Sequence, residues 1–355
     1  MLRRSIATWL LYAILWCGHC AASEPVTAEN YVAPEANSKD EPLAETYSLE
    51  AAARFLDAAA IDWTTKRTCF TCHTNYSYLM ARPLISAAPS DKAPAHTFVR
   101  AALETIVVDR WEKRGPRWPT EVVASGAILA FNDAHTTGKL HPASKQALDR
   151  MWTVQRADGS WKWLNCDYPP MESDDHYGVT IAAVGVGVAP DGYAQSPAAQ
   201  AGLAKIKSYL RENPGEHLHQ RAMVLWASTY LPDLELQTAA ESSKCIDELL
   251  SLQHSDGGWS TAALGKWQRA DHTPQDTASS DGYGTGFVIY VLRRTGLPAE
   301  DPRLKKGIAW LKANQRASGR WFTRSLHQDS KHYLTHAGTA YACMALAACG
   351  ETLGK

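Results

Sequence analysis

The sequence predicts an all-α protein, a single (α/α)6 toroid in which six outer helices alternate with six inner helices. One observation is the alternation of polarity along the chain. Amphipathic stretches such as PAAQAGLAKIKSYLRE are followed by stretches that are apolar nearly all round, such as VTIAAVGVGV and GTAYACMALAA. An amphipathic helix lies at the surface, whereas a helix that is apolar on all sides is buried. The other observation is a short pattern that recurs at three turns.

The helices are expected in outer and inner pairs, each outer helix first. Periodicity places them at residues 46–62, 76–87, 95–114, 120–133, 142–156, 176–188, 196–212, 216–230, 236–253, 281–296, 301–315 and 335–350. The long loops from outer to inner helices, above all 159–177 and 257–283, then share one rim of the toroid, where a functional site is expected.

The recurring pattern is Gln, three residues, Gly, one residue and Trp. Its copies are QRADGSW (155–161), QHSDGGW (253–259) and QRASGRW (315–321), each at the end of an amphipathic stretch. Gln ends the helix, Gly allows a left-handed backbone, and Trp folds back over the turn. We interpret these residues as structural.

This pattern resembles the QW repeats of the terpenoid cyclase and protein prenyltransferase superfamily, α/α toroids that include squalene-hopene cyclases. The resemblance covers most of the chain after about residue 45. It implies the toroid fold and a hydrophobic, isoprenoid-like ligand in a central cavity, with terpenoid-cyclase-type chemistry if the protein is an enzyme. Because one fold hosts many functions, the resemblance leaves enzymatic activity open.

The N-terminus predicts export. Arg3 and Arg4 precede an apolar run over 6–16, and small residues at 21–23 offer a cleavage site, so residues 1–22 are interpreted as a signal peptide. An uncleaved membrane anchor is the alternative, although the run is shorter than the roughly 20 residues that span a bilayer. The mature protein is expected in the periplasm or outside the cell. Residues 23–45 are expected to be a disordered linker before the toroid at 46–355.

Charge gives no indication of a macromolecular partner. Lys plus Arg total 36 and Asp plus Glu total 37, so no nucleic-acid partner is expected. Association with a membrane surface is not indicated, and the oligomeric state is not determined by the sequence.

The string Cys69-Phe70-Thr71-Cys72-His73 has the CxxCH spacing of c-type cytochromes. It predicts covalent haem c, with thioethers at Cys69 and Cys72 and His73 as the proximal iron ligand. His96 is the better candidate for the sixth ligand, and Met80 the other. A Cys69–Cys72 disulfide or redox pair and a metal site completed by other ligands are the alternatives. The string occupies the first outer-to-inner turn, where later repeats carry the Gln-Gly-Trp pattern.

The string Glu172-Ser173-Asp174-Asp175 resembles the DxDD acid of squalene-hopene cyclases, in which a protonated Asp protonates an alkene. Glu replaces the first Asp here, and HYGVT follows where the family has Thr directly. Asp174 and Asp175 are therefore candidate catalytic residues. Their alternative role is to cap the helix that follows.

Polar residues also precede two later inner helices, and they include the other two candidate catalytic residues, Asp281 and His336. These positions are similar to the first and last zinc ligands of prenyltransferase β-subunits, but the Cys between them is missing, and no metal is expected. His327, His332 and Tyr333 lie near His336, and Tyr283 near Asp281. Three functions stay open: a protein that binds or converts a hydrophobic ligand, a haem-bearing redox or electron-transfer protein, and a non-catalytic interaction toroid.

Overall fold

The computed structural model describes residues 24–67, 69–86 and 93–354, and the regular elements of this part of the chain are all helices, without β-strands beyond two isolated bridges. The all-α toroid is confirmed. The expected signal peptide lies outside the described residues. None of the described helices is long and apolar enough to cross a membrane.

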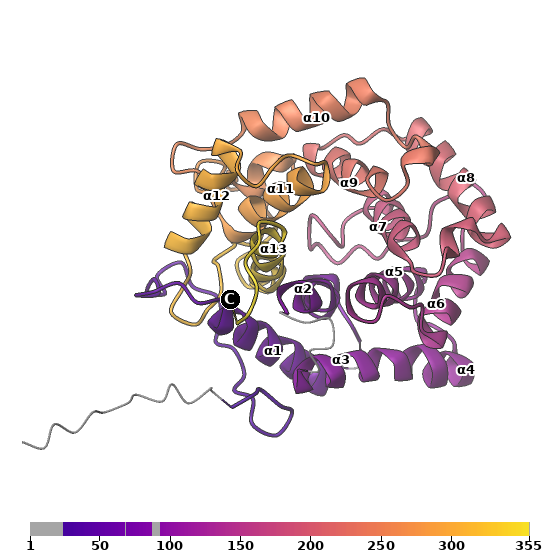
Figure 1. The fold of residues 1–355 in the computed structure, drawn as a ribbon, viewed down its shortest axis with the longest axis horizontal. Coiled ribbons are helices and arrows are strands. Elements are labelled where there is room, and N and C mark those ends of the chain that lie inside the picture. Colours follow the sequence, from indigo (N-terminus) through magenta and orange to yellow (C-terminus); the bar gives the residue numbers. More distant parts are fainter. Residues whose placement is uncertain (1–23, 68, 87–92, 355) are drawn as a thin grey trace, which may run out of the picture.

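The inner helices form a closed ring around the toroid axis (Figure 1), in which each contacts the next and the last contacts the first. They are α2 (Ser77–Ile85), α5 (Pro119–Thr136), α7 (Asp175–Val188), α9 (Leu218–Ser228), α11 (Gly282–Arg294) and α13 (Leu334–Ala348). A π-helical turn, η1 (Cys72–Tyr76), leads into α2. These helices are buried on nearly all sides, as their composition predicts.

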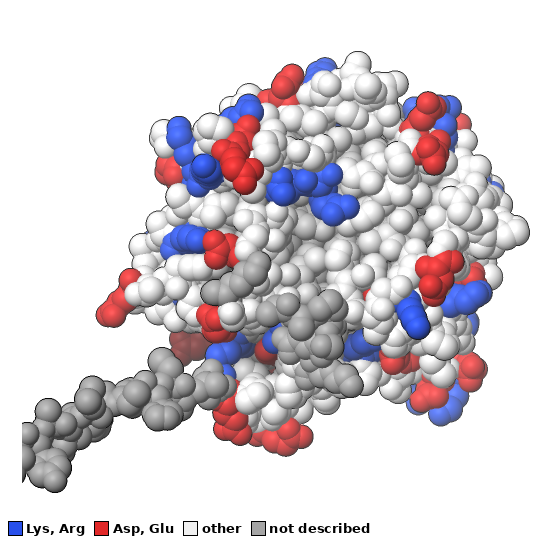
Figure 2. Space-filling model, in the orientation of Figure 1, with Lys and Arg blue, Asp and Glu red and all other residues white. Residues whose placement is uncertain are grey.

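The outer helices surround this ring. They are α1 (Leu49–Lys66), α3 (Pro94–Thr105), α6 (Pro142–Thr153), α8 (Pro197–Glu212), α10 (Ala239–Ser251) and α12 (Pro302–Ala313). The outer helix expected at 95–114 is divided, because α3 continues through a π-helical turn, η2 (Ile106–Arg110), into α4 (Trp111–Arg114). Short 3-10 turns lie at η3 (Tyr193–Gln195), η4 (Pro232–Leu234) and η5 (Thr261–Leu264). Figure 2 shows basic and acidic side chains interspersed on one face of the toroid.

The three Gln-Gly-Trp turns have the same geometry. Each Trp is fully buried and donates its indole N–H to a carbonyl of the outer helix that precedes it. The acceptors are Met151 for Trp161 (3.0 Å), Leu249 for Trp259 (2.7 Å) and Leu311 for Trp321 (2.7 Å).

The Gln side chains join neighbouring outer helices. Each Gln donates to the carbonyl of its own turn Gly and to a second carbonyl in or beside the next outer helix in the ring. The second acceptors are Gly202 for Gln155, Arg303 for Gln253 and Ser48 for Gln315. Since Ser48 caps α1, the last turn closes the ring onto the first helix.

The segment 24–45 differs from the disordered linker that the sequence predicts. The Glu41 carboxylate accepts from the Arg320 guanidinium, Asn37 Nδ2 donates to the Thr323 carbonyl (2.9 Å), and Ala44 N–H donates to the Gln315 carbonyl (2.8 Å). Composition alone indicated disorder, whereas charge-assisted hydrogen bonds to this buried arginine hold the segment against the last repeat.

Candidate functional site

Three segments meet at the rim where the inner helices begin: η1, the loop before α7 and the loop before α13. Cys72 N–H donates to Glu172 Oε1 (3.3 Å), which joins η1 to the second segment. Lys331 Nζ donates to the Cys166 carbonyl (2.6 Å), which joins the second segment to the third. This junction brings together residues that lie far apart in the sequence.

Three cysteines lie near one carboxylate at this junction, and we call Cys69, Cys72, Cys166 and Glu172 the thiol site. All three cysteines are free, with Cys72 buried and the other two partly exposed. Both Cys72 and Cys166 have side chains that neighbour the Glu172 carboxylate. Burial raises the pKa of each thiol, and the nearby Glu172 charge raises it further.

Glu172 is the buried acid of the Glu-Ser-Asp-Asp string. It is only 6% exposed, and burial raises its pKa although the Cys72 N–H and the Lys331 charge favour the ionised form. The sequence did not single out Glu172 as functional, because the resemblance to DxDD directed attention to the two aspartates. The Cys-x-x-Cys string was visible, but its proximity to Glu172 and Cys166 was not.

An aromatic cage encloses His73, beside the thiol site. Its imidazole lies between the rings of Tyr168 (centroids 4.6 Å apart) and Tyr333 (5.6 Å), with the edge of Trp63 at 4.9 Å. Burial lowers the pKa of His73 well below its usual value.

One hydroxyl joins His73 to His336, one of the candidate catalytic residues. Thr74 Oγ1 lies 2.8 Å from His73 Nδ1 and 3.0 Å from His336 Nδ1. A hydroxyl carries one hydrogen, so at most one imidazole accepts from Thr74 and the other donates to it. Burial lowers the pKa of His336 to about 3, so both rings are neutral near pH 7.

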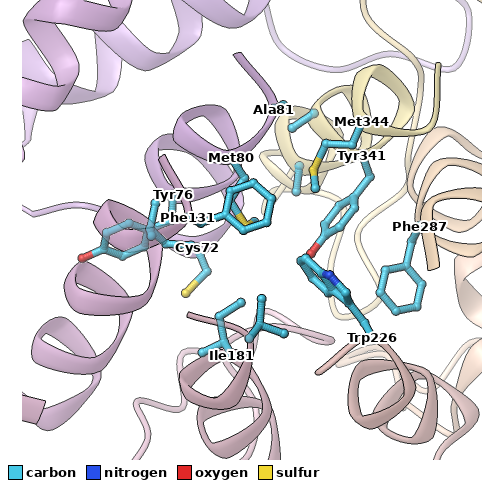
Figure 3. Close-up of a cluster of buried hydrophobic side chains, with 14 of the residues drawn as sticks. Cys72, Tyr76, Met80, Ala81, Phe131, Ile181, Trp226, Phe287, Tyr341 and Met344 are labelled. Carbon is cyan, nitrogen blue, oxygen red and sulfur yellow. The ribbon is translucent and has the colours of Figure 1, made fainter. Parts of the chain in front are cut away.

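The haem expected at Cys69, Cys72 and His73 does not fit the chain as it is folded here. Cys72 lies among the axial side chains (Figure 3) and is buried, whereas thioether formation needs an accessible sulfur beside the porphyrin. The faces of His73 are covered by Tyr168 and Tyr333. Of the two candidate sixth ligands, His96 contacts Asn132 through Nε2 (2.8 Å) and Met80 is buried in the axial cluster. No described group of three or more His, Cys, Asp or Glu residues is arranged to hold a metal ion.

The two candidate catalytic residues at the start of α7 both have structural contacts. Asp174 is the N-cap of α7 and accepts from Tyr177 N–H (2.9 Å). Asp175 accepts from Trp163 N–H (2.8 Å) and from the Arg156 guanidinium (2.8 Å). Asp174 therefore has the capping role that the sequence offered as the alternative to catalysis, whereas Asp175 begins the helix and joins it to the preceding loop.

Asp281 caps α11 in the same way. It accepts from Gly284 N–H (2.9 Å), and both the backbone and the hydroxyl of Thr261 donate to it. Burial raises its pKa against these hydrogen bonds. It also lines a small pocket of about 50 Å³ with Asp276, Ser280 and Arg324 among others, but neither Asp174 nor His336 lines that pocket.

Large side chains fill the toroid axis below this rim. Trp226, Phe287, Tyr341, Phe131 and Met344 point toward one another (Figure 3), and none of them has solvent-accessible surface. Side chains therefore fill this level of the axis, where the resemblance implies a central cavity. Above it, His219 Nε2 lies 2.9 Å from the Tyr283 hydroxyl, and burial lowers the pKa of His219 to about 3.

Comparison with known proteins agrees with the fold. No protein-family model and no curated protein sequence matches the chain. A solved structure from Klebsiella pneumoniae, described as a possible member of the GH105 family, matches with a TM-score of 0.51 and 10% identity over 86% of this chain and 94% of its own. The type II terpene cyclase MstE from Scytonema matches with a TM-score of 0.46 and 11% identity over 84% and 98%. At such low identity the first likeness establishes the α/α toroid fold alone, and the second adds no argument.

Proposed function

We propose that this toroid acts through thiol chemistry at its rim, with Cys69 and Cys72 as a reversible dithiol–disulfide couple. The observation that supports the proposal is the thiol site itself, where a partly exposed and a buried cysteine, separated by two residues, lie near the Glu172 carboxylate. In the reaction, two thiols transfer two electrons and two protons to an incoming disulfide. That disulfide leaves as two thiols, and a Cys69–Cys72 bond forms.

The pKa directions indicate which kind of couple this is. Strongly oxidising dithiols have a stabilised thiolate, which makes their reduced form stable. Here burial raises the pKa of both Cys69 and Cys72, so the thiolates are disfavoured. We therefore propose a couple whose disulfide resists reduction. Its thiols should react faster as the pH rises toward their pKa values, because the thiolate is the reactive form.

The other functions have weaker support. Cyclase-type chemistry needs a protonated acid that faces an alkene in a cavity, whereas Asp174 caps α7 and the axis is filled. Covalent haem would require Tyr168 or Tyr333 to leave His73 and the buried Cys72 sulfur to become accessible. Export, which the N-terminus predicts, would place the thiol couple in an oxidising compartment where disulfides persist.

A redox titration of the purified full-length protein tests the proposal. The protein is equilibrated in buffers of increasing glutathione disulfide-to-thiol ratio, quenched and alkylated, and each cysteine is assigned by mass spectrometry. Cys69 and Cys72 should both lose alkylation and a peptide linked through Cys69 and Cys72 should appear as the ratio rises, and a Cys245→Ser control, altered on α10, should titrate as the wild type does.

Two results would overturn the proposed function. One is full alkylation of Cys69 and Cys72 in the most oxidising buffer. The other is a Soret absorption band that survives denaturation after co-expression with a cytochrome c maturation system, which would assign these cysteines to haem instead.

A further inference from the structure

Cys166 is a cysteine to which the sequence assigned no role, and a short hairpin holds it in the thiol site. Its N–H donates to the Glu172 carbonyl (3.1 Å), and a bridge pairs Tyr168 with Glu172. The hairpin returns the chain so that the Cys166 side chain neighbours the same carboxylate as Cys72. Lys331 fixes the hairpin from the third segment through the Cys166 carbonyl.

The three thiols differ in solvent exposure. Cys72 is buried, whereas Cys69 and Cys166 are both partly exposed. Cys69 and Cys166 are also close enough to interact electrostatically with each other. The other cysteines of the described residues lie elsewhere, with Cys245 in α10, Cys343 in α13 and Cys349 at its C-cap.

We propose that Cys166 is the third thiol of this site and that Cys72 exchanges its disulfide partner between Cys69 and Cys166. The inference rests on the proposed function, and it adds a second disulfide and a direction of transfer. The oxidant is a disulfide, either of a small thiol or of a protein, and it reacts first at the partly exposed Cys69.

Each step balances. The Cys69 thiolate attacks the incoming disulfide and releases one thiolate, and Cys72 then attacks Cys69 and releases the second, which leaves a Cys69–Cys72 disulfide. The Cys166 thiolate next attacks the Cys72 sulfur and expels the Cys69 thiolate. That last step moves no net electrons, and the proton that Cys166 loses is taken up by the departing Cys69.

The exchange would change what the disulfide joins. A Cys69–Cys72 bond is local to the turn before α2, whereas a Cys72–Cys166 bond ties that turn to the loop before α7. Oxidation would then link the starts of two inner helices and restrain the rim above the axial core. Reduced Cys69 would be free to react again.

Peptide mapping of the oxidised full-length protein tests this inference. Wild-type, Cys69→Ser and Cys166→Ser proteins are treated with oxidised glutathione, quenched with acid, alkylated and digested without reduction, with Cys245→Ser as the matched control. The wild type should give both linked peptides, with the 69–72 link appearing first, and Cys166→Ser only the 69–72 link. Cys69→Ser lacks the disulfide that Cys166 attacks, so its 72–166 link should form more slowly than in the wild type, through direct reaction of the partly exposed Cys166 with glutathione disulfide. Far-UV circular dichroism verifies the fold, and alanine variants replace any serine variant that does not fold.

The peptide maps distinguish failure of the disulfide exchange from failure of the proposed function. If the wild type forms the 69–72 link but no 72–166 link at any ratio, the exchange is wrong and the proposed function stands. If the wild type forms neither link at any ratio of oxidised to reduced glutathione, both are wrong.

Discussion

The first outer-to-inner turn (residues 69–76) and the three Gln-Gly-Trp turns occupy the same place in the repeat, yet they are built from different chemistry. In the Gln-Gly-Trp turns, the Gln amide and the Trp indole N–H are hydrogen-bonded to backbone carbonyls. In the first turn the indole donor is Trp63, which belongs to the preceding helix and donates to the Cys69 carbonyl (3.2 Å). The turn itself carries two thiols, an imidazole and the hydroxyls of Thr71, Thr74 and Tyr76.

In this toroid, structural contacts and reactive groups are carried by different copies of the same turn. The repeated turns hold neighbouring outer helices together, and Gln315 closes the ring onto Ser48. The first turn lacks the Gln and Trp that make these contacts, so its residues are available for reactive groups. It also contains a π-helical turn, a feature that often marks functional sites. Changes in the Gln-Gly-Trp turns should therefore affect stability, and changes in the first turn should affect chemistry.

The largest effect is expected at a repeat tryptophan. Trp259→Ala removes a fully buried indole and its hydrogen bond, which should lower the free energy of unfolding by about 3 to 5 kcal/mol. Trp118, which is 40% exposed, is the control, and its replacement by alanine should change the same quantity by no more than about 0.5 kcal/mol. Urea unfolding measures both. Equal urea midpoints for Trp259→Ala and the wild type would contradict a stabilising role for the repeat tryptophans.

The next effect concerns the turn glycines. Gly319 has a φ of +92°, and a Cβ there would collide with the Ala51 carbonyl of α1, whereas Gly350 has a φ of +96° with nothing near. Gly319→Ala should lower the free energy of unfolding by about 2 to 3 kcal/mol through strain and collision together. Gly350→Ala should show the backbone strain alone, about 1 kcal/mol. Similar losses for the two variants would mean that the close approach to α1 contributes nothing.

The sequence predicted the scaffold far better than the site, for a physical reason. Helix periodicity and the Gln-Gly-Trp spacing are local patterns, so the toroid and its three turns could be read from the chain directly. The thiol site depends on Cys166 and Glu172 meeting Cys72 about 100 residues away, a contact that no local pattern encodes. Asp174 was a candidate on resemblance, but its position before α7 equally suits an N-cap, and that is where the structure places it.

Acid should lower the free energy of unfolding through two buried histidines near the rim. Burial lowers the pKa of His219 and His336 to about 3, so between pH 3 and 6.5 the unfolded chain binds more protons than the folded one. Their contribution to stability is therefore complete above pH 6.5 and declines as the pH falls, by about 2 kcal/mol per histidine from pH 8 to 5. Urea midpoints across this range measure it, and His219→Gln should show a shallower decline. An equal slope in the variant would contradict the assignment.

The glutamines of the repeated turns should differ among themselves. Gln315 is buried, and its side-chain amide accepts from the Ser48 N–H and donates to the Ser48 carbonyl, whereas Gln253 is only partly buried. Gln315→Leu should cost about 1 to 2 kcal/mol, because it leaves buried backbone groups without partners. Gln253→Leu should cost less, since water can reach the freed carbonyls. Urea unfolding compares the two, and a larger loss for Gln253→Leu would contradict the view that the last turn closes the ring.

The smallest effect on stability is expected at Cys69, and it is the sharpest test of the comparison. The side chain is partly exposed, and the hydrogen bond from Trp63 uses the Cys69 backbone carbonyl, which a serine retains. Cys69→Ser should therefore change the unfolding free energy of the reduced protein by less than about 1 kcal/mol, while it abolishes the Cys69–Cys72 couple in the glutathione titration. The repeated turns should show the reverse, with Gln253→Leu less stable but with its thiols titrating as in the wild type. A Cys69→Ser protein that loses as much stability as Trp259→Ala would mean that the first turn is scaffold as well.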